Sequence, residues 1–121
     1  TAIEIDKIKI YSNTIAQLRI ENETSESSSE RWIKVTATIQ ARVGFSNSYL
    51  NCKLKSPTDT KERKIRLFSP ISQSGEFNNY EFFVEVPETF TNFDADIYFT
   101  SDDEFEGSLL SIRIVYLKEE L

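Results

Sequence analysis

The stretch RWIKVTATIQARVGF at residues 31–45 decides the fold. Apolar side chains occupy its odd positions from Ile33 to Val43, and polar side chains occupy the even positions from Lys34 to Arg42. Because successive side chains of a strand point to opposite faces, this alternation predicts one long strand with an apolar and a polar face. The many β-branched residues favour the same conformation.

Seven other segments show shorter versions of this alternation. The first of them changes parity at Asp6–Lys7, which predicts a bulge or a bend that crosses between sheets. We expect these strands near residues 2–11, 15–21, 48–55, 65–67, 80–86, 95–100 and 109–117. About eight closely spaced strands without helical periodicity predict an all-β fold, an antiparallel β-sandwich of the jelly-roll type.

Polar stretches separate these segments. Residues 22–30 (NETSESSSE) contain no apolar residue and predict a loop, and they include the glycosylation tripeptide Asn22-Glu23-Thr24. Residues 56–63 and the acidic residues 101–107 are expected to form turns.

Length and charge limit the classes of protein that the chain can represent. Its 121 residues fit a single domain spanning residues 1–121, and a start at Thr1 without a leader suggests a fragment of a larger protein. The net charge of −6 argues against nucleic acid and against an anionic membrane surface as partners. No apolar run approaches the roughly 18 residues that a membrane helix needs.

The chain carries few groups for catalysis or metal binding. It contains no histidine, and its one cysteine, Cys52, alternates with Leu50 and Leu54, which predicts a buried side chain. The carboxylates of residues 94–106 leave calcium binding possible, although their spacing does not match an EF-hand. We therefore expect no resident metal or other cofactor.

Carboxylate pairs are the remaining route to catalysis. Glu81 or Glu85 with Asp96 could serve a hydrolase, but glycoside hydrolysis needs a set separation in a cleft, which the sequence does not establish. The chain offers few long loops to wall such a cleft. We therefore expect a protein that is not an enzyme.

Several aromatic residues fall on the polar parity of their strands. Phe83 and Tyr98 are predicted to point outward, as are Tyr49 and Phe68. Aromatic rings can stack on the apolar faces of sugars, while Arg66, Glu85 and Asp96 could bond to hydroxyls. The same rings could equally cover one another or anchor a protein interface. Trp32 could be a further platform, but we expect it to plug the end of the sandwich.

The C-terminal half resembles a known family. The segments NNYEFFVEVP, DADIYFTS and LLSIRIVYLKE, between residues 78 and 119, are similar to the last strands of jelly-roll carbohydrate-binding modules. RWIKVTATIQARV is similar to their long central strand. Such modules accompany glycoside hydrolases and occur on bacteriophage tail baseplates and fibres. Tyr80 stands where the family often has Trp, so binding here would depend on Phe and Tyr.

This resemblance implies a non-catalytic carbohydrate-binding module that recognises a host or cell-surface glycan, extracellularly or on a virion. It would be a module of a phage tail or baseplate protein, in contact with other structural subunits. The alternative that the residues leave open is a structural or adhesion domain that mediates protein–protein assembly. A small hydrolase is the third possibility.

Overall fold

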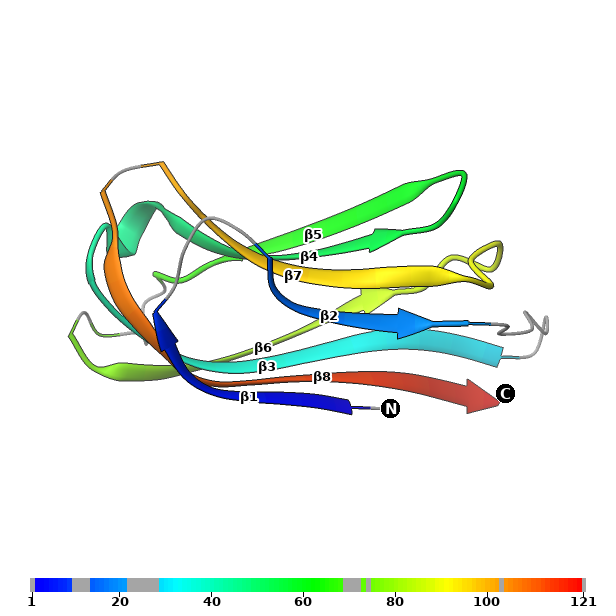
Figure 1. Cartoon of the computed structure of the whole chain (residues 1–121), viewed down its shortest axis with the longest axis horizontal. Helices are drawn as coiled ribbons and strands as arrows, with labels where there is room; N and C mark the ends of the chain where they lie inside the picture. The colour runs from blue at the N-terminus through cyan, green and yellow to red at the C-terminus, as the bar shows by residue number, and fades with distance from the viewer. Residues whose placement is uncertain are drawn as a thin grey trace.

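The protein is a β-sandwich of two four-stranded antiparallel sheets, seen in a computed structural model (Figure 1). The structure describes residues 2–9, 14–21, 29–68, 73, 75–102 and 104–120. A short 3-10 turn, η1 (Phe45–Asn47), is the helical element in these ranges, and it is far too short to span a membrane. The strands are β1 (Ala2–Lys9), β2 (Thr14–Ile20), β3 (Ser29–Val43), β4 (Ser48–Lys55), β5 (Thr60–Arg66), β6 (Phe77–Glu85), β7 (Phe93–Ser101) and β8 (Glu106–Glu120).

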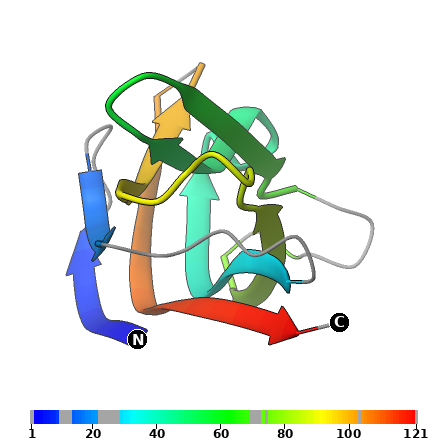
Figure 2. The same ribbon diagram turned by 90° about the vertical axis from the view of Figure 1, so that its right-hand side faces the viewer.

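The strand order is that of a jelly roll, as predicted. Sheet A has the order β1-β8-β3-β6, and sheet B has the order β2-β7-β4-β5. The first strand pairs with the last, the second with the seventh, the third with the sixth and the fourth with the fifth. The chain is thus a long antiparallel double strand rolled into two layers, which Figure 2 shows from one end.

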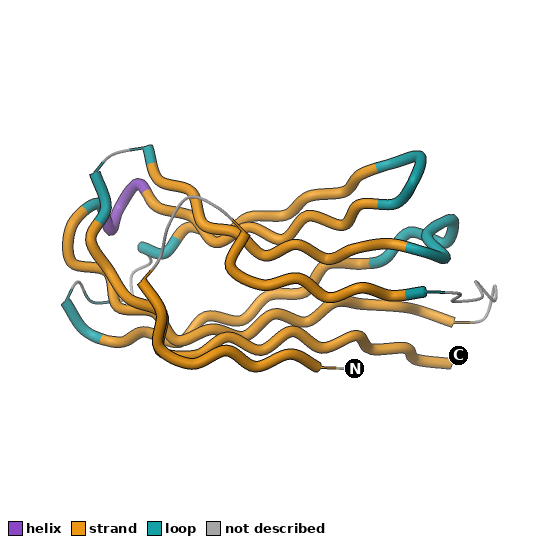
Figure 3. Tube along the Cα trace, in the orientation of Figure 1, coloured by secondary structure: helices purple, strands orange, loops and turns teal. Residues whose placement is uncertain are grey.

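The core lies between the two layers, and the alternation of β3 supplies its centre. Ile33, Val35 and Ile39 on sheet A are fully buried, as are Leu54 and Ile97 on sheet B. Strands make up most of the described chain (Figure 3), so inward side chains follow the period of two almost throughout. Cys52 is buried among them, as predicted.

The parity change at Asp6–Lys7 reflects a bend rather than a bulge in β1. The β1–β8 register runs without a shift from Ala2 opposite Val115 to Lys9 opposite Ser108. The extra residue is Leu110 of β8, because β3 pairs Thr38 with Ser111 and then Ile39 with Leu109. Both strands curve together at this end of the sandwich (Figure 1).

Strand β5 corrects one expectation. Residues 56–63 were expected to be a turn, yet the strand Thr60–Arg66 includes half of them. It is an edge strand in which charged residues occupy both parities, so hydrophobic alternation could not reveal it. Its hydrogen-bond ladder with β4 decides its conformation.

The ends of several other elements also differ from the prediction. Strand β6 begins at Phe77 rather than near residue 80, and β8 begins at Glu106, inside the turn expected at residues 101–107. Phe45 was expected in the long strand but begins η1. Most of the predicted loop at residues 22–30 lies outside the described residues, including its glycosylation tripeptide, although residues 29–30 belong to β3.

Two cations close the open edge between the sheets. Lys61 Nζ donates a hydrogen bond of 2.8 Å to the backbone carbonyl of Glu85, and Arg63 Nη1 donates to that of Phe83. Both donors come from edge strand β5 of sheet B, and both acceptors lie on edge strand β6 of sheet A. Side chains thus occupy edge carbonyls that another strand could otherwise pair with.

Buried Arg31 holds the connection between β6 and β7. Arg31 is 3% exposed, and its guanidinium donates to the carbonyls of Phe90 at 2.6 Å, Pro87 at 2.7 Å and Glu88 at 3.3 Å. Phe90 is itself buried and contacts the buried ring of Phe93, with ring centroids 6.0 Å apart. The connection is therefore part of the core rather than a free loop.

Candidate functional site

The structure divides the predicted site between two opposite faces. Phe83 and Glu85 lie on the outer face of sheet A, because β6 belongs to that sheet. Tyr98 and Asp96 lie on the outer face of sheet B with β7, the next strand in sequence. Phe83 and Tyr98 were both proposed to stack on a ligand, but they cannot form one platform, since the core separates them.

Tyr49 and Arg66 meet on sheet B. They are cross-strand partners on β4 and β5, and Arg66 Nη2 lies 2.9 Å from the Tyr49 hydroxyl, to which it donates a hydrogen bond. The Arg66 guanidinium and the Lys64 ammonium also lie over the Tyr49 ring, at 5.4 Å and 4.6 Å from its centroid. Phe68 follows the end of β5 and is 49% exposed. Tyr49 is thus accompanied by two cations.

Tyr98 is held by a neighbouring carboxylate. Its hydroxyl donates a hydrogen bond to Glu62 Oε2 on β5. Partial burial and this bond raise the pKa of Tyr98 to about 12. Beneath it, the buried Asn51 amide donates to the Tyr98 carbonyl and to Thr100 Oγ1, at 3.2 Å and 3.0 Å. The hydrogen of the Tyr98 hydroxyl is therefore already used in a bond within the protein.

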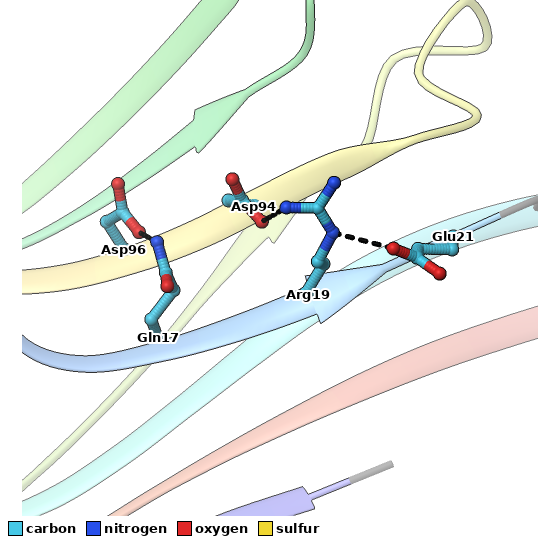
Figure 4. A network of polar contacts seen from close by, with 5 residues as sticks. All are labelled: Gln17, Arg19, Glu21, Asp94 and Asp96. Atoms are coloured by element: carbon cyan, nitrogen blue, oxygen red, sulfur yellow. Dashed lines mark hydrogen bonds and ion pairs between the residues drawn. The ribbon is translucent and has the colours of Figure 1, made fainter.

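Asp96 belongs to a polar network at the β2–β7 edge (Figure 4). Gln17 Nε2 donates to Asp96 Oδ1 at 2.7 Å, while Arg19 pairs with Glu21 at 2.7 Å and with Asp94 at 3.7 Å. A shallow depression of about 280 Å³ lies over these residues. The polar side chains of this edge therefore satisfy one another's hydrogen-bonding groups and charges.

A larger groove crosses the outer face of sheet A. Its volume is about 450 Å³, and it lies over the middle of β8, β3 and β6. Thr38 Oγ1 donates to Asn79 Oδ1 at 2.7 Å across its floor. The outward side chains that line it are hydroxyls, an amide, a carboxylate and a guanidinium, contributed by Thr36, Thr38, Ser111, Asn79, Glu81 and Arg113.

An aromatic corner adjoins one end of this groove. Trp32 of β3 and Phe83 of β6 contact each other edge to face, with ring centroids 6.5 Å apart. Lys34 lies between them and the groove, 5.8 Å from the Phe83 centroid and 3.7 Å from Glu81. Trp32 was expected to plug the end of the sandwich, but its even position on β3 places it on the outer face.

A second aromatic residue marks the other end of the groove. Phe77 is 48% exposed and is the cross-strand partner of Gln40. Phe77 lies six positions before Phe83 along β6, which is roughly 20 Å in an extended strand. The polar groove, the Trp32–Phe83 corner at one end and Phe77 at the other therefore form one surface along the strand direction. We call it the sheet A surface.

The predicted carboxylate pairs do not form. Glu81 and Glu85 lie on the outer face of sheet A, whereas Asp96 lies on that of sheet B. Within the described ranges, no group of three or more Cys, Asp and Glu side chains is arranged to hold a metal ion. Asp103, part of the acidic turn considered for calcium, lies outside the described residues.

Sequence reasoning missed the polar floor of the groove. Thr36 and Thr38 were recognised as the polar face of the long strand but not as part of a site. The signal in the sequence was the two small polar residues at even positions between Trp32 and Gln40. Ser111 could not be added, because only the β3–β8 register brings it beside those threonines.

Comparisons with known proteins add little to this geometry. No family model matches the sequence, and no curated protein matches it significantly. Among solved structures, the chain is similar to one described as "EclA C-terminal domain; sugar-binding protein". The TM-score is 0.38 at 11% identity, and the alignment covers 98% of this chain and 77% of the other. A likeness this distant carries no argument about function, so the proposals below rest on the residues themselves.

Proposed function

We propose that this protein is a non-catalytic carbohydrate-binding module whose ligand lies on the sheet A surface. The observation that carries this proposal is the outward-facing corner of half-buried Trp32 and exposed Phe83 beside a polar groove of about 450 Å³. Sugars present apolar C–H faces and many hydroxyls, so they need both aromatic rings and paired hydrogen-bonding groups. The sheet A surface offers both next to each other.

Each group on this surface has a role in the proposal. Phe83 and Trp32 stack on a sugar ring, and Phe77 contacts a second ring further along the strands. Asn79, Glu81 and Arg113 exchange hydrogen bonds with hydroxyls, because an amide, a carboxylate and a guanidinium can each take part in two such bonds. The groove volume is at the lower end of typical ligand sites, which suits a short oligosaccharide.

The sheet B residues predicted from the sequence take no part in this site. Tyr98 and Asp96 are bonded to Glu62 and Gln17, and Tyr49 carries two cations over its ring. Of the seven predicted residues, Phe83 stays in the proposed site, and Glu85 lies beside Trp32 as its cross-strand partner.

A glycan array followed by calorimetry tests the proposal. We expect a reproducible hit whose affinity falls about 10-fold or more in Phe83→Ala and in Asn79→Ala, since stacking and charge-free hydrogen bonds each supply about 1–2 kcal/mol. Tyr98→Phe on the opposite face is the matched control and should bind like wild type. A hit that both groove variants leave unchanged would refute the site, and a blank array from folded protein would refute the function.

The setting of this module remains part of the proposal. We place it outside the cell or on a virion, where glycans are accessible, as a module of a phage tail or baseplate protein. The support for this setting is the resemblance of the strand pattern at residues 78–119 to such modules. Immunogold labelling of virions, or its failure, tests the setting separately from sugar binding.

An assembly domain is the second candidate function. Leu117 is 38% exposed and is the cross-strand partner of Trp32 opposite Glu85, which widens the aromatic corner into an apolar patch. Such patches also suit protein interfaces. Light scattering distinguishes the two functions: a concentration-dependent oligomer that Leu117→Asp dissolves would favour assembly, and a strict monomer would favour the glycan module.

A further inference from the structure

Positive charge is concentrated on one hairpin of this acidic protein. Strands β4 and β5 with their turn, residues 48–66, hold six of the 14 basic residues and two of the 20 acidic ones. The hairpin therefore carries a net charge of +4, while the rest of the chain carries −10. The six cations are Lys53, Lys55, Lys61, Arg63, Lys64 and Arg66.

Two of these cations have carboxylates opposite them on β7, because Lys53 is the cross-strand partner of Asp96 and Lys55 that of Asp94. Among the residues that the structure describes, the ion pairs are Arg19 with Glu21 and Asp94, and Lys34 with Glu81; none involves the hairpin. Glu62, the carboxylate within the strand, accepts the Tyr98 hydroxyl instead. Lys64 and Arg66 instead lie opposite the uncharged Asn51 and Tyr49, so their charges remain available to an anionic ligand.

The six cations divide into two sets by parity. Lys61 and Arg63 reach the carbonyls of β6 and close the sandwich edge. Lys53, Lys55, Lys64 and Arg66 lie on the outward parity of sheet B, opposite Glu62, Thr60, Asn51 and Tyr49 respectively in the β4–β5 register. The second set forms a separate surface, which we call the basic hairpin face.

Tyr49 positions two of these cations together. Lys64 and Arg66 both lie over its ring, and the hydroxyl accepts one Arg66 N–H, so the two side chains are gathered at one point. A guanidinium has five N–H donors, and its remaining donors can bind a carboxylate or sulfate in two places at once. Cation–π contacts thus hold Lys64 and Arg66 ready for an anionic group.

We propose that the basic hairpin face binds an acidic polysaccharide, one that carries uronate or sulfate groups. Nucleic acid fits less well, because the Tyr49 ring is covered by cations and cannot stack on bases. A duplex also carries one charge per roughly 1.7 Å, which the −10 of the remaining chain would repel. An acidic polysaccharide carries only one charge in every sugar or two. The rest of the chain therefore repels it less than it repels a duplex when it binds this small cationic cluster. This proposal is independent of the sheet A surface, which lies on the opposite face.

Binding of the whole chain to defined polymers tests this proposal. The probes are polygalacturonate and heparin, with neutral dextran and duplex DNA for comparison, measured by calorimetry at low and high NaCl. We expect binding to at least one acidic polysaccharide, little binding to dextran or DNA, and loss of binding at high salt, because exposed charges are screened. Phe83→Ala should not change this binding, which separates it from the proposed sugar site.

Charge-matched variants locate the binding. Lys64→Gln with Arg66→Gln should weaken binding about 10-fold or more, because two charge-assisted contacts are lost. Arg42→Gln with Lys118→Gln removes the same charge from strands of sheet A and should change affinity by about 2-fold or less. If loss of the Arg66–Tyr49 bond unfolds the double variant, Lys64→Gln alone supplies the test. Equal losses in both pairs, no acidic polysaccharide bound, or DNA bound as tightly would each overturn the proposal.

Discussion

Trp32 and Phe83 contact each other edge to face on the outside of sheet A, with ring centroids 6.5 Å apart and ring planes at 89°. This geometry directs the positive edge of one ring toward the negative face of the other. The pair comes from neighbouring strands β3 and β6, where Trp32 lies opposite Glu85 and Phe83 lies opposite Lys34. The aromatic corner is therefore a diagonal cross-strand pair, held by the sheet rather than by a loop.

The first prediction concerns the energy of this pair. In a double-mutant cycle, Trp32→Ala and Phe83→Ala should couple by about 0.5–1.5 kcal/mol in the free energy of unfolding. The matched cycle of Trp32→Ala with Phe77→Ala should be additive, because Phe77 lies at the far end of β6. Urea denaturation measures both cycles. Equal coupling in the two cycles would show that the corner is not a specific contact.

The second prediction concerns the buried guanidinium of Arg31. Arg31→Met should lower the free energy of unfolding by about 3 kcal/mol, because three carbonyls of the β6–β7 connection lose their donor inside the protein. Arg42→Met on the exposed side of the same strand should cost under about 1 kcal/mol. Chemical denaturation compares the two, and similar losses would contradict the role given to Arg31.

The third prediction separates backbone strain from steric overlap at two glycines. Gly44 and Gly75 both have a positive φ, +77° and +83°. A Cβ at Gly44 would overlap the backbone carbonyl of Glu104, whereas a Cβ at Gly75 would have nothing within 4 Å. In each alanine variant, the left-handed backbone conformation of a residue with a Cβ lowers the free energy of unfolding by about 1 kcal/mol. Gly44→Ala should lower the melting temperature clearly further than Gly75→Ala, and equal shifts would contradict the close approach.

The fourth prediction concerns alkaline pH. Burial raises the pKa of the Cys52 thiol from 9.0 to about 12, with the Asp96 and Glu62 carboxylates adding to the effect, and the pKa of Tyr98 rises from 10.0 to about 12. Above pH 9 the unfolded chain loses these protons while the folded protein keeps them. The free energy of unfolding should therefore fall as pH rises from about 9 to about 12.

Two variants assign this alkaline loss. Cys52→Ala should reduce the fall in the free energy of unfolding that begins near pH 9, and Tyr98→Phe should reduce the part that begins near pH 10. Each variant removes one group that loses its proton at a lower pH in the unfolded chain than in the folded protein. Denaturation at a series of pH values measures both. If neither variant alters the slope, other groups govern alkaline unfolding.

The sequence by itself determined most of the strands, β5 excepted, and the direction of their side chains. In Ile33 to Val43 an apolar residue recurs at every second position, and a pleated strand needs only its own residues to set that period. For the same reason the buried Cys52 and the outward Phe83 and Tyr98 could be predicted. Alternation did not predict Arg31, whose position among the inward residues of β3 suits a buried cation only because the distant carbonyls of residues 87–90 surround it.

Only the tertiary structure decided which outward residues share a face. Phe83 and Tyr98 are close in sequence and both point outward, yet pairing of β6 with β3 and of β7 with β2 and β4 places them on opposite sheets. Conversely, Thr38 and Ser111 are far apart in sequence and lie side by side in the groove. Alternation records whether a side chain faces in or out, but it holds no information on which strand lies alongside, because that depends on pairing across the whole chain.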